Sequence, residues 1–93
     1  MNFLELIHLL HENKAEKIYL IHEENRENET RNFAQRLRNL GFIPLIGADF
    51  RKGGERLVRN AIEKADLCIL LAFDEETKDY AEKMNIPFLE VFI

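Results

Sequence analysis

The chain has no tryptophan, two prolines, four glycines and a single cysteine among its 93 residues. One cysteine cannot form a disulfide framework or a zinc site by itself. Because Cys68 lies inside an apolar run, we expect a buried thiol and a reducing, cytoplasmic location. No apolar run is long enough to span a membrane, and Glu5 interrupts the first one, so we expect neither a membrane span nor a signal peptide.

Positive charge is also scarce. The chain has 13 Lys and Arg against 17 Asp and Glu, a net charge of −4. Binding of DNA or RNA depends on clustered basic residues that neutralise phosphates, so this balance argues against a nucleic-acid partner. The length allows one domain over residues 1–93, and a hydrophobic content of 46% is enough for one core.

Short apolar runs alternate with amphipathic segments of helical period. The runs predict strands at residues 17–22, 42–46, 66–73 and 87–93. The segments predict helices at 2–13, from about 30 to Leu40, at 54–65 and between Asp74 and Asn85, with loops at 23–29 and 47–53. Alternation of this kind indicates an α/β fold, in which helices cover a parallel sheet.

The order of the strands follows from two residues that suit only the edges of a sheet. Pro44 cannot donate a ladder hydrogen bond, and Glu90 is charged in mid-strand. The run at 66–73 is the most apolar and should be central. Right-handed crossovers then give the order 2-1-3-4. We predict a three-layer αβα domain, flavodoxin-like or Rossmann-like, with an extra N-terminal helix on the face that otherwise lacks one.

Sheets of this kind bind ligands at the carboxyl ends of their strands. The richest of the loops expected there is 47–54, which contains Asp49, Arg51, Lys52, Gly53 and Gly54. The glycine pair opens a helix whose first N–H groups attract anions, so a phosphate could bind there. The alternative is that the glycines only turn the chain and the cations face solvent.

An acidic rim is predicted beside this loop. Glu23, Glu24 and Glu27 follow the first strand, and Asp74, Glu75, Glu76 and Thr77 follow the third. A divalent cation could bridge these carboxylates, or they could simply be solvated. We include Asp74 and Thr77 among the ligand-binding candidates and predict no metal ligand.

The histidines are ambiguous. His22 ends the first strand, where a general base could stand, although a structural role is the commoner one. His8 and His11 lack a third metal ligand nearby. Thr77 has no histidine–acid partner in the sequence, so nucleophilic catalysis has no visible support.

Much of the chain resembles Toll/interleukin-1 receptor (TIR) domains. The resemblance lies in residues 18–22 (IYLIH), 29–33 (ETRNF), 37–42 (LRNLGF), 49–55 (DFRKGGE) and 61–71 (AIEKADLCILL). Some members of that family cleave NAD with a glutamate in a W-x-x-E helix. The nearest positions here are Glu82 and then Glu76, in a chain without tryptophan. The resemblance therefore implies a TIR-like fold and an NAD-related ligand.

A second resemblance covers the C-terminal half. Residues 47–50 (GADF), 58–60 (VRN), 66–73, 77–79 (TKD) and 86–87 (IP) resemble SLOG domains, which are Rossmann-like binders of nucleotide-derived ligands. Nucleoside deoxyribosyltransferases are a weaker third match. All three groups imply a nucleotide-derived or NAD-like ligand.

Three hypotheses result. The first is a non-catalytic TIR-like or SLOG-like module that acts in signalling or defence. It would bind a nucleotide-derived ligand, a protein partner, or both. The second is a self-assembling protein that forms a homodimer through the apolar edge strand 87–93. The third is an enzyme that hydrolyses the N-glycosidic bond of NAD or a nucleoside.

Overall fold

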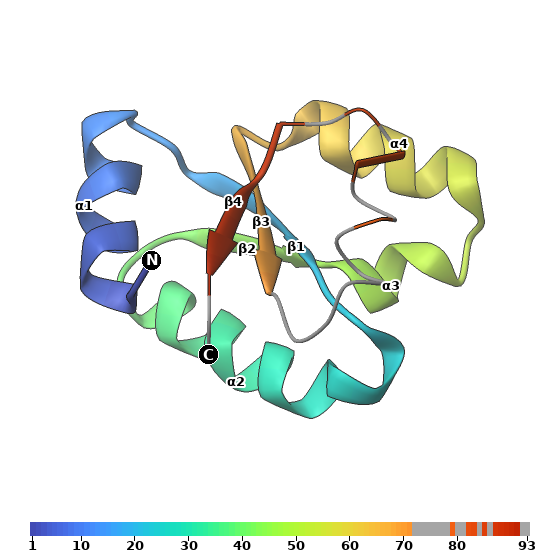
Figure 1. Cartoon of the computed structure of the whole chain (residues 1–93), viewed down its shortest axis with the longest axis horizontal. Coiled ribbons are helices and arrows are strands. Elements are labelled where there is room, and N and C mark those ends of the chain that lie inside the picture. The colour runs from blue at the N-terminus through green and yellow to red at the C-terminus, as the bar shows by residue number, and fades with distance from the viewer. Residues whose placement is uncertain (72–78, 80–81, 84, 86, 92–93) are drawn as a thin grey trace.

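The computed structural model describes residues 1–71, 79, 82, 83, 85 and 87–91. Strands β1 (Lys17–Ile21), β2 (Ile43–Ile46), β3 (Leu67–Leu71) and β4 (Leu89–Val91) form one parallel sheet in the order β2-β1-β3-β4 (Figure 1). The predicted fold class and order are confirmed. Pro44 and Glu90 lie on the two edge strands, as their chemistry requires.

The register of the central strand separates the core into two faces. Leu20 of β1 pairs with Ile46 on one side and Ile69 on the other, and all three belong to one cluster of buried residues. The next residue toward the amino end of β1, Tyr19, pairs with Cys68, and both belong to a second cluster. Alternate residues point to opposite faces of a strand, so β1 and β3 are apolar on both sides.

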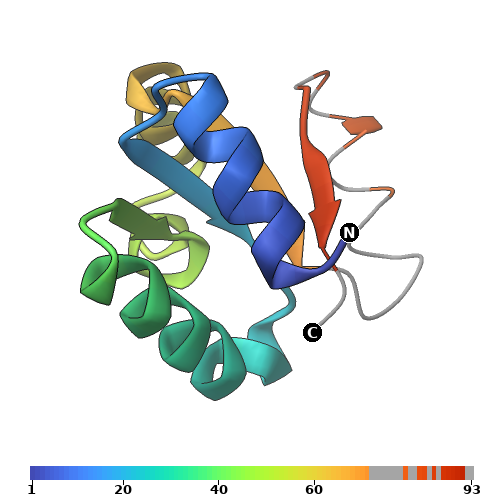
Figure 2. The same cartoon turned by 90° about the vertical axis from the view of Figure 1, so that its left-hand side faces the viewer.

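Each face is covered by two helices. The first cluster lies under α1 (Phe3–Glu12) and α2 (Glu27–Asn39), and the second lies under α3 (Gly47–Arg51) and α4 (Glu55–Lys64). Figure 2 shows α1 lying across the sheet on the side that α2 also covers. The N-terminal helix therefore covers the face that we predicted would need it. No helix among the described residues is long and apolar enough to cross a membrane.

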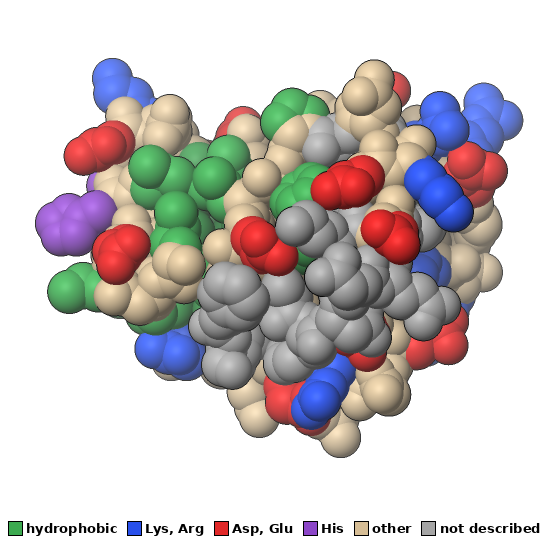
Figure 3. All heavy atoms as spheres, in the orientation of Figure 1, with side chains coloured by type: hydrophobic (Ala, Val, Ile, Leu, Met, Phe, Trp, Pro, Cys, Tyr) green, Lys and Arg blue, Asp and Glu red, His purple; other side chains and the backbone are tan. Residues whose placement is uncertain are grey.

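Helix α1 is held at its start and on its side. The Asn2 side chain accepts the N–H of Glu5 at 2.9 Å, which satisfies one unpaired donor of the first turn. The Phe3 ring meets the Phe33 ring edge-on with centroids 5.6 Å apart, and the Arg36 guanidinium lies 3.7 Å from the Phe3 ring centroid. In Figure 3, hydrophobic side chains gather beside α1, where it meets the sheet.

Asp66 joins the amino ends of β1 and β3. Its carboxylate accepts the backbone N–H groups of Glu16 and Lys17, both at 2.9 Å, and its own N–H donates to the Lys17 carbonyl at 2.7 Å. The two bonds to the carboxylate hold the pKa of Asp66 below its usual value, because they stabilise the charged form. This end of the sheet is therefore fixed independently of the carboxyl end.

Some predicted boundaries are wrong. The expected loop 47–53 is helical from Gly47 to Arg51, directly after β2, and the expected loop 23–29 contains the 3₁₀ helix η1 (Glu24–Arg26) and the first turn of α2. His22 and Phe42 lie just outside the strands to which we assigned them. Gly41 does end α2, with φ of +92°. Most of the helix expected between Asp74 and Asn85, and residues 72–73 and 92–93 of two strands, lie outside the described residues.

The predicted burial of the Cys68 thiol is confirmed. Cys68 is 5% exposed, and burial raises the pKa of its thiol to about 11, so it remains protonated in the core. Strand β4 pairs with β3 alone among the described strands. Two copies that paired antiparallel about Glu90 would place two carboxylates opposite each other, which is destabilising. The homodimer stays a prediction.

We predict that Gly47→Ala destabilises the domain by about 1–3 kcal/mol, because a β-carbon would lie 2.9 Å from the backbone oxygen of Leu20, which cannot move freely. Urea unfolding measures the change. Gly53→Ala is the matched control, since its β-carbon would meet only the side chain of Leu57, which is 47% exposed and able to rotate away. Equal losses in the two variants would contradict the close approach at Gly47.

Candidate functional site

The order β2-β1-β3-β4 places the topological switch point between β1 and β3. In open parallel sheets, ligands bind beside the carboxyl ends of the two strands at this point. The described part of this rim consists of His22, which follows β1, together with η1, the start of α2, and α3. The geometry of the candidate site therefore depends on the contacts among these segments.

The imidazole of His22 joins the end of β1 to the start of α3. Its side chain is buried, with 3% of the residue exposed. Nε2 lies 3.1 Å from the backbone nitrogen of Ala48, and Nδ1 lies 2.7 Å from the carbonyl oxygen of Glu23. A backbone N–H can only donate and a carbonyl can only accept, so Nδ1 carries the hydrogen and Nε2 is the acceptor. His22 thereby caps a helix that has no side-chain cap of its own.

His22 is neutral in this arrangement. Burial lowers the pKa of the imidazole below 6.5, because the charged form loses its hydration, and the positive charge of Arg51 lowers it further. The Glu23 carbonyl and the charge of Glu27 act in the opposite direction but do not compensate. With both ring nitrogens engaged, His22 is a structural residue of this rim rather than an available general base.

Arg51 lies over the imidazole. One terminal nitrogen of its guanidinium is 3.3 Å from Nδ1 and 3.3 Å from Nε2 of His22. An atom equally distant from both nitrogens in the ring plane would collide with the ring carbon between them, so the guanidinium lies over the ring face. Arg51 is half-buried, and no described carboxylate lies within ion-pair distance of it. A cation at the switch point is thus supported by a neutral ring.

Asp49 is engaged in an ion pair. Its carboxylate accepts from Arg31 at 2.8 Å, and Arg31 also donates to Glu27 at 3.4 Å, so one arginine ties α3 to the first turn of α2. Arg26 pairs in turn with Glu29 at 3.1 Å. These pairs neutralise part of the acidic segment that follows β1, which lowers the repulsion that an anion would meet there.

The glycine pair begins α4. Gly54 is the N-cap with φ of +92°, and no side chain caps the helix. Lys52, Arg56 and Arg59 are exposed around it, and several basic side chains lie over this end of the molecule in Figure 3. Arg59 is paired with Glu55 at 3.1 Å. The uncapped helix start therefore lies among cations, as an anion would require.

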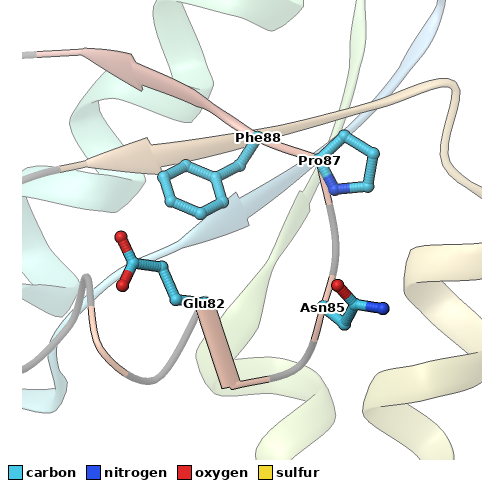
Figure 4. A pocket seen from close by; sticks show the side chains of 4 residues that line it. All are labelled: Glu82, Asn85, Pro87 and Phe88. Atoms are coloured by element: carbon cyan, nitrogen blue, oxygen red, sulfur yellow. The ribbon is translucent and has the colours of Figure 1, made fainter.

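Among the remaining candidates, the structure describes Glu82. Glu82 lines a hollow of about 380 Å³ with Asn85, Pro87 and Phe88, and Figure 4 shows its carboxylate on the side of the Phe88 ring. None of the candidates on the described rim lines that hollow. Asp74, Glu75, Glu76 and Thr77 lie outside the described residues. Within the described part of the chain, no three His, Cys, Asp or Glu side chains gather to hold a metal ion.

Sequence reasoning missed Arg31 and the start of α3. Arg31 and Asp49 are 18 residues apart, and His22 and Ala48 are 26 apart. The available signal was a histidine directly after one strand and a glycine directly after its neighbour, since the carboxyl ends of adjacent parallel strands meet at one edge.

Comparisons of the chain with protein-family models, curated proteins and solved structures found no match. The TIR and SLOG resemblances therefore stay predictions.

We predict that His22→Leu lowers the free energy of unfolding by about 1–3 kcal/mol near neutral pH, because the Ala48 N–H and the Glu23 carbonyl lose a partner at a buried position. His22→Gln is the control, since its amide can still accept from Ala48. Urea unfolding of both variants gives the comparison. A loss in His22→Gln as large as that in His22→Leu would show that packing, not the cap, is what His22 contributes.

Proposed function

We propose that this domain is a non-catalytic, TIR-like or SLOG-like module that binds a phosphate-bearing, nucleotide-derived ligand at the carboxyl end of its sheet. NAD, ADP-ribose and related molecules are the ligand class. One observation supports this proposal most directly. The guanidinium of Arg51 is half-buried beside the switch point and forms no ion pair with a described carboxylate.

Arg51 has the environment of an anion receptor. A charge removed from water is costly unless it is paired, and the face-on contact with a neutral imidazole supplies no opposite charge. A phosphate would supply that charge, and an arginine binds phosphate oxygens with two parallel N–H donors. The two ion pairs of Arg31 reduce the negative potential that such a ligand would meet.

A second phosphate would fit the start of α4. The residues between the two positions are few, since Arg51 ends α3 and Gly54 caps α4. The uncapped N–H groups of the first turn, with Lys52 and Arg56 exposed beside them, favour negative charge. A pyrophosphate could bridge Arg51 and this helix start, which supports a ligand with two linked phosphates, such as NAD or ADP-ribose, over a nucleoside monophosphate.

The same geometry supports binding without catalysis. Both nitrogens of His22 are occupied by backbone groups, so this histidine is not available as a general base. Glu82, the nearest match to the catalytic glutamate of TIR enzymes, lines a hollow that includes no other described candidate. Hydrolysis of NAD or a nucleoside is therefore not favoured by any described contact.

We predict that ADP-ribose binds the wild-type domain and that Arg51→Gln weakens binding about 10- to 100-fold, the range expected when charge-assisted hydrogen bonds are lost. Isothermal titration calorimetry measures both affinities, with NAD and AMP as further ligands. Arg38→Gln is the matched control, because Arg38 is exposed in the last turn of α2, away from this rim, and the charge change is the same. No binding by the wild type, or equal weakening in the two variants, would refute the proposal.

A further inference from the structure

We propose that His22 makes this site proton-sensitive: protonation of its ring removes the cap of α3 and displaces Arg51, so the anion binds only while the ring is neutral. The inference rests on the proposed function for its ligand, but the structural change that it describes occurs in the free protein. It assigns to His22 a positioning role that acts through α3 and Arg51 rather than through contact with the ligand.

The first step is the loss of an acceptor. The Ala48 N–H points at Nε2 of His22 from 3.1 Å. An imidazolium carries hydrogens on both nitrogens and accepts none, so protonation would place two donors against each other at a buried position. Nδ1 already donates to the Glu23 carbonyl at 2.7 Å, so the ring cannot turn to offer its other nitrogen without losing that bond.

The second step is repulsion over the ring face. The Arg51 guanidinium lies 3.3 Å from both ring nitrogens, a contact that a neutral ring tolerates and a cationic ring opposes. Ala48 and Arg51 belong to the same five-residue helix. A helix this short is not stable by itself, so losing its cap and repelling its last residue act together on α3.

The charged and titratable groups around His22 come from every described element that packs on it. They are Tyr19 of β1, Glu23 beside the ring, Glu27 and Arg31 of α2, and Asp49 and Arg51 of α3. Glu27 favours the protonated ring, while Arg31 and Arg51 oppose it. Arg31 is itself paired with Asp49 and Glu27, so Arg51 is the cation whose position responds most directly.

The direction of the pH effect follows from the lowered pKa of His22. The unfolded chain takes up this proton near pH 6.5, the usual value, and the folded chain only at lower pH. The stabilisation from the neutral ring is therefore complete above pH 6.5 and is lost as the pH falls through the folded-state pKa. The neutral, binding-competent form should dominate at physiological pH.

The test compares ADP-ribose affinity of the wild type and His22→Gln at about pH 7.5 and about pH 5, a range that spans histidine titration. ADP-ribose suits this test because its pyrophosphate does not change charge between these values. We expect the wild type to lose at least about tenfold in affinity at the lower pH. We expect His22→Gln, whose amide accepts from Ala48 at any pH, to bind equally at both. Unchanged or stronger wild-type binding at low pH, or the same pH dependence in both proteins, would overturn the inference.

Amide resonances of the ligand-free protein separate this inference from the proposed function. In the wild type, the Ala48 and Arg51 signals should shift with the same midpoint as the His22 ring, and in His22→Gln they should not. If ADP-ribose fails to bind but these shifts occur, the proposed ligand is wrong and the proton switch stands. If the Ala48 signal does not follow the ring, the switch is wrong whether or not the ligand binds.

Discussion

The arrangement at the carboxyl end of the sheet depends on one buried, neutral imidazole. His22 directly follows β1, accepts the N–H of Ala48 in the first turn of α3 and donates to the backbone carbonyl of Glu23, in the segment that leads into α2. Its face supports Arg51. The two hydrogen bonds require an uncharged ring with its hydrogen on Nδ1, and the contact with Arg51 also favours the uncharged ring. The position of Arg51 therefore depends on the protonation state of a single ring.

The two ends of the sheet are stabilised by different chemistry. At the amino end, an exposed carboxylate, Asp66, accepts two backbone N–H groups and is charged at neutral pH. At the carboxyl end, a buried and uncharged ring makes the corresponding link. Between them, β1 is apolar on both faces and is covered by α1 and α2 on one side and α3 and α4 on the other. The buried core thus lies between two titratable groups, a charged carboxylate at the amino end of the sheet and a neutral imidazole at the carboxyl end.

The fold was predictable because its determinants are local or chemically restrictive. Pro44 and Glu90 restricted their strands to the edges, burial on both faces of β1 and β3 follows from their apolar runs, and Gly41 supplies the left-handed residue that ends α2. The start of α3 was not predictable in the same way. Glycine, aspartate and basic residues at 47–53 are typical of a loop, and the cap that makes them helical comes from a residue 26 positions away.

The candidate site was predictable in composition but not in contacts. The residues of 47–54 do lie at the carboxyl end of the sheet, as the strand order requires. Asp49, however, forms an ion pair with Arg31, and Arg51 contacts the ring of His22. No spacing in the sequence indicates these two contacts. Such contacts depend on side-chain geometry across three elements, which only the assembled fold defines.

The nitrogen NMR spectrum of the His22 ring at neutral pH tests most directly whether the rim depends on a neutral imidazole. It reports which nitrogen carries the hydrogen and whether the ring is charged. We predict a neutral ring with its hydrogen on Nδ1 and with Nε2 acting as an acceptor, held in this one form. A charged ring, a hydrogen on Nε2, or the averaged tautomers of a solvent-exposed histidine would contradict it.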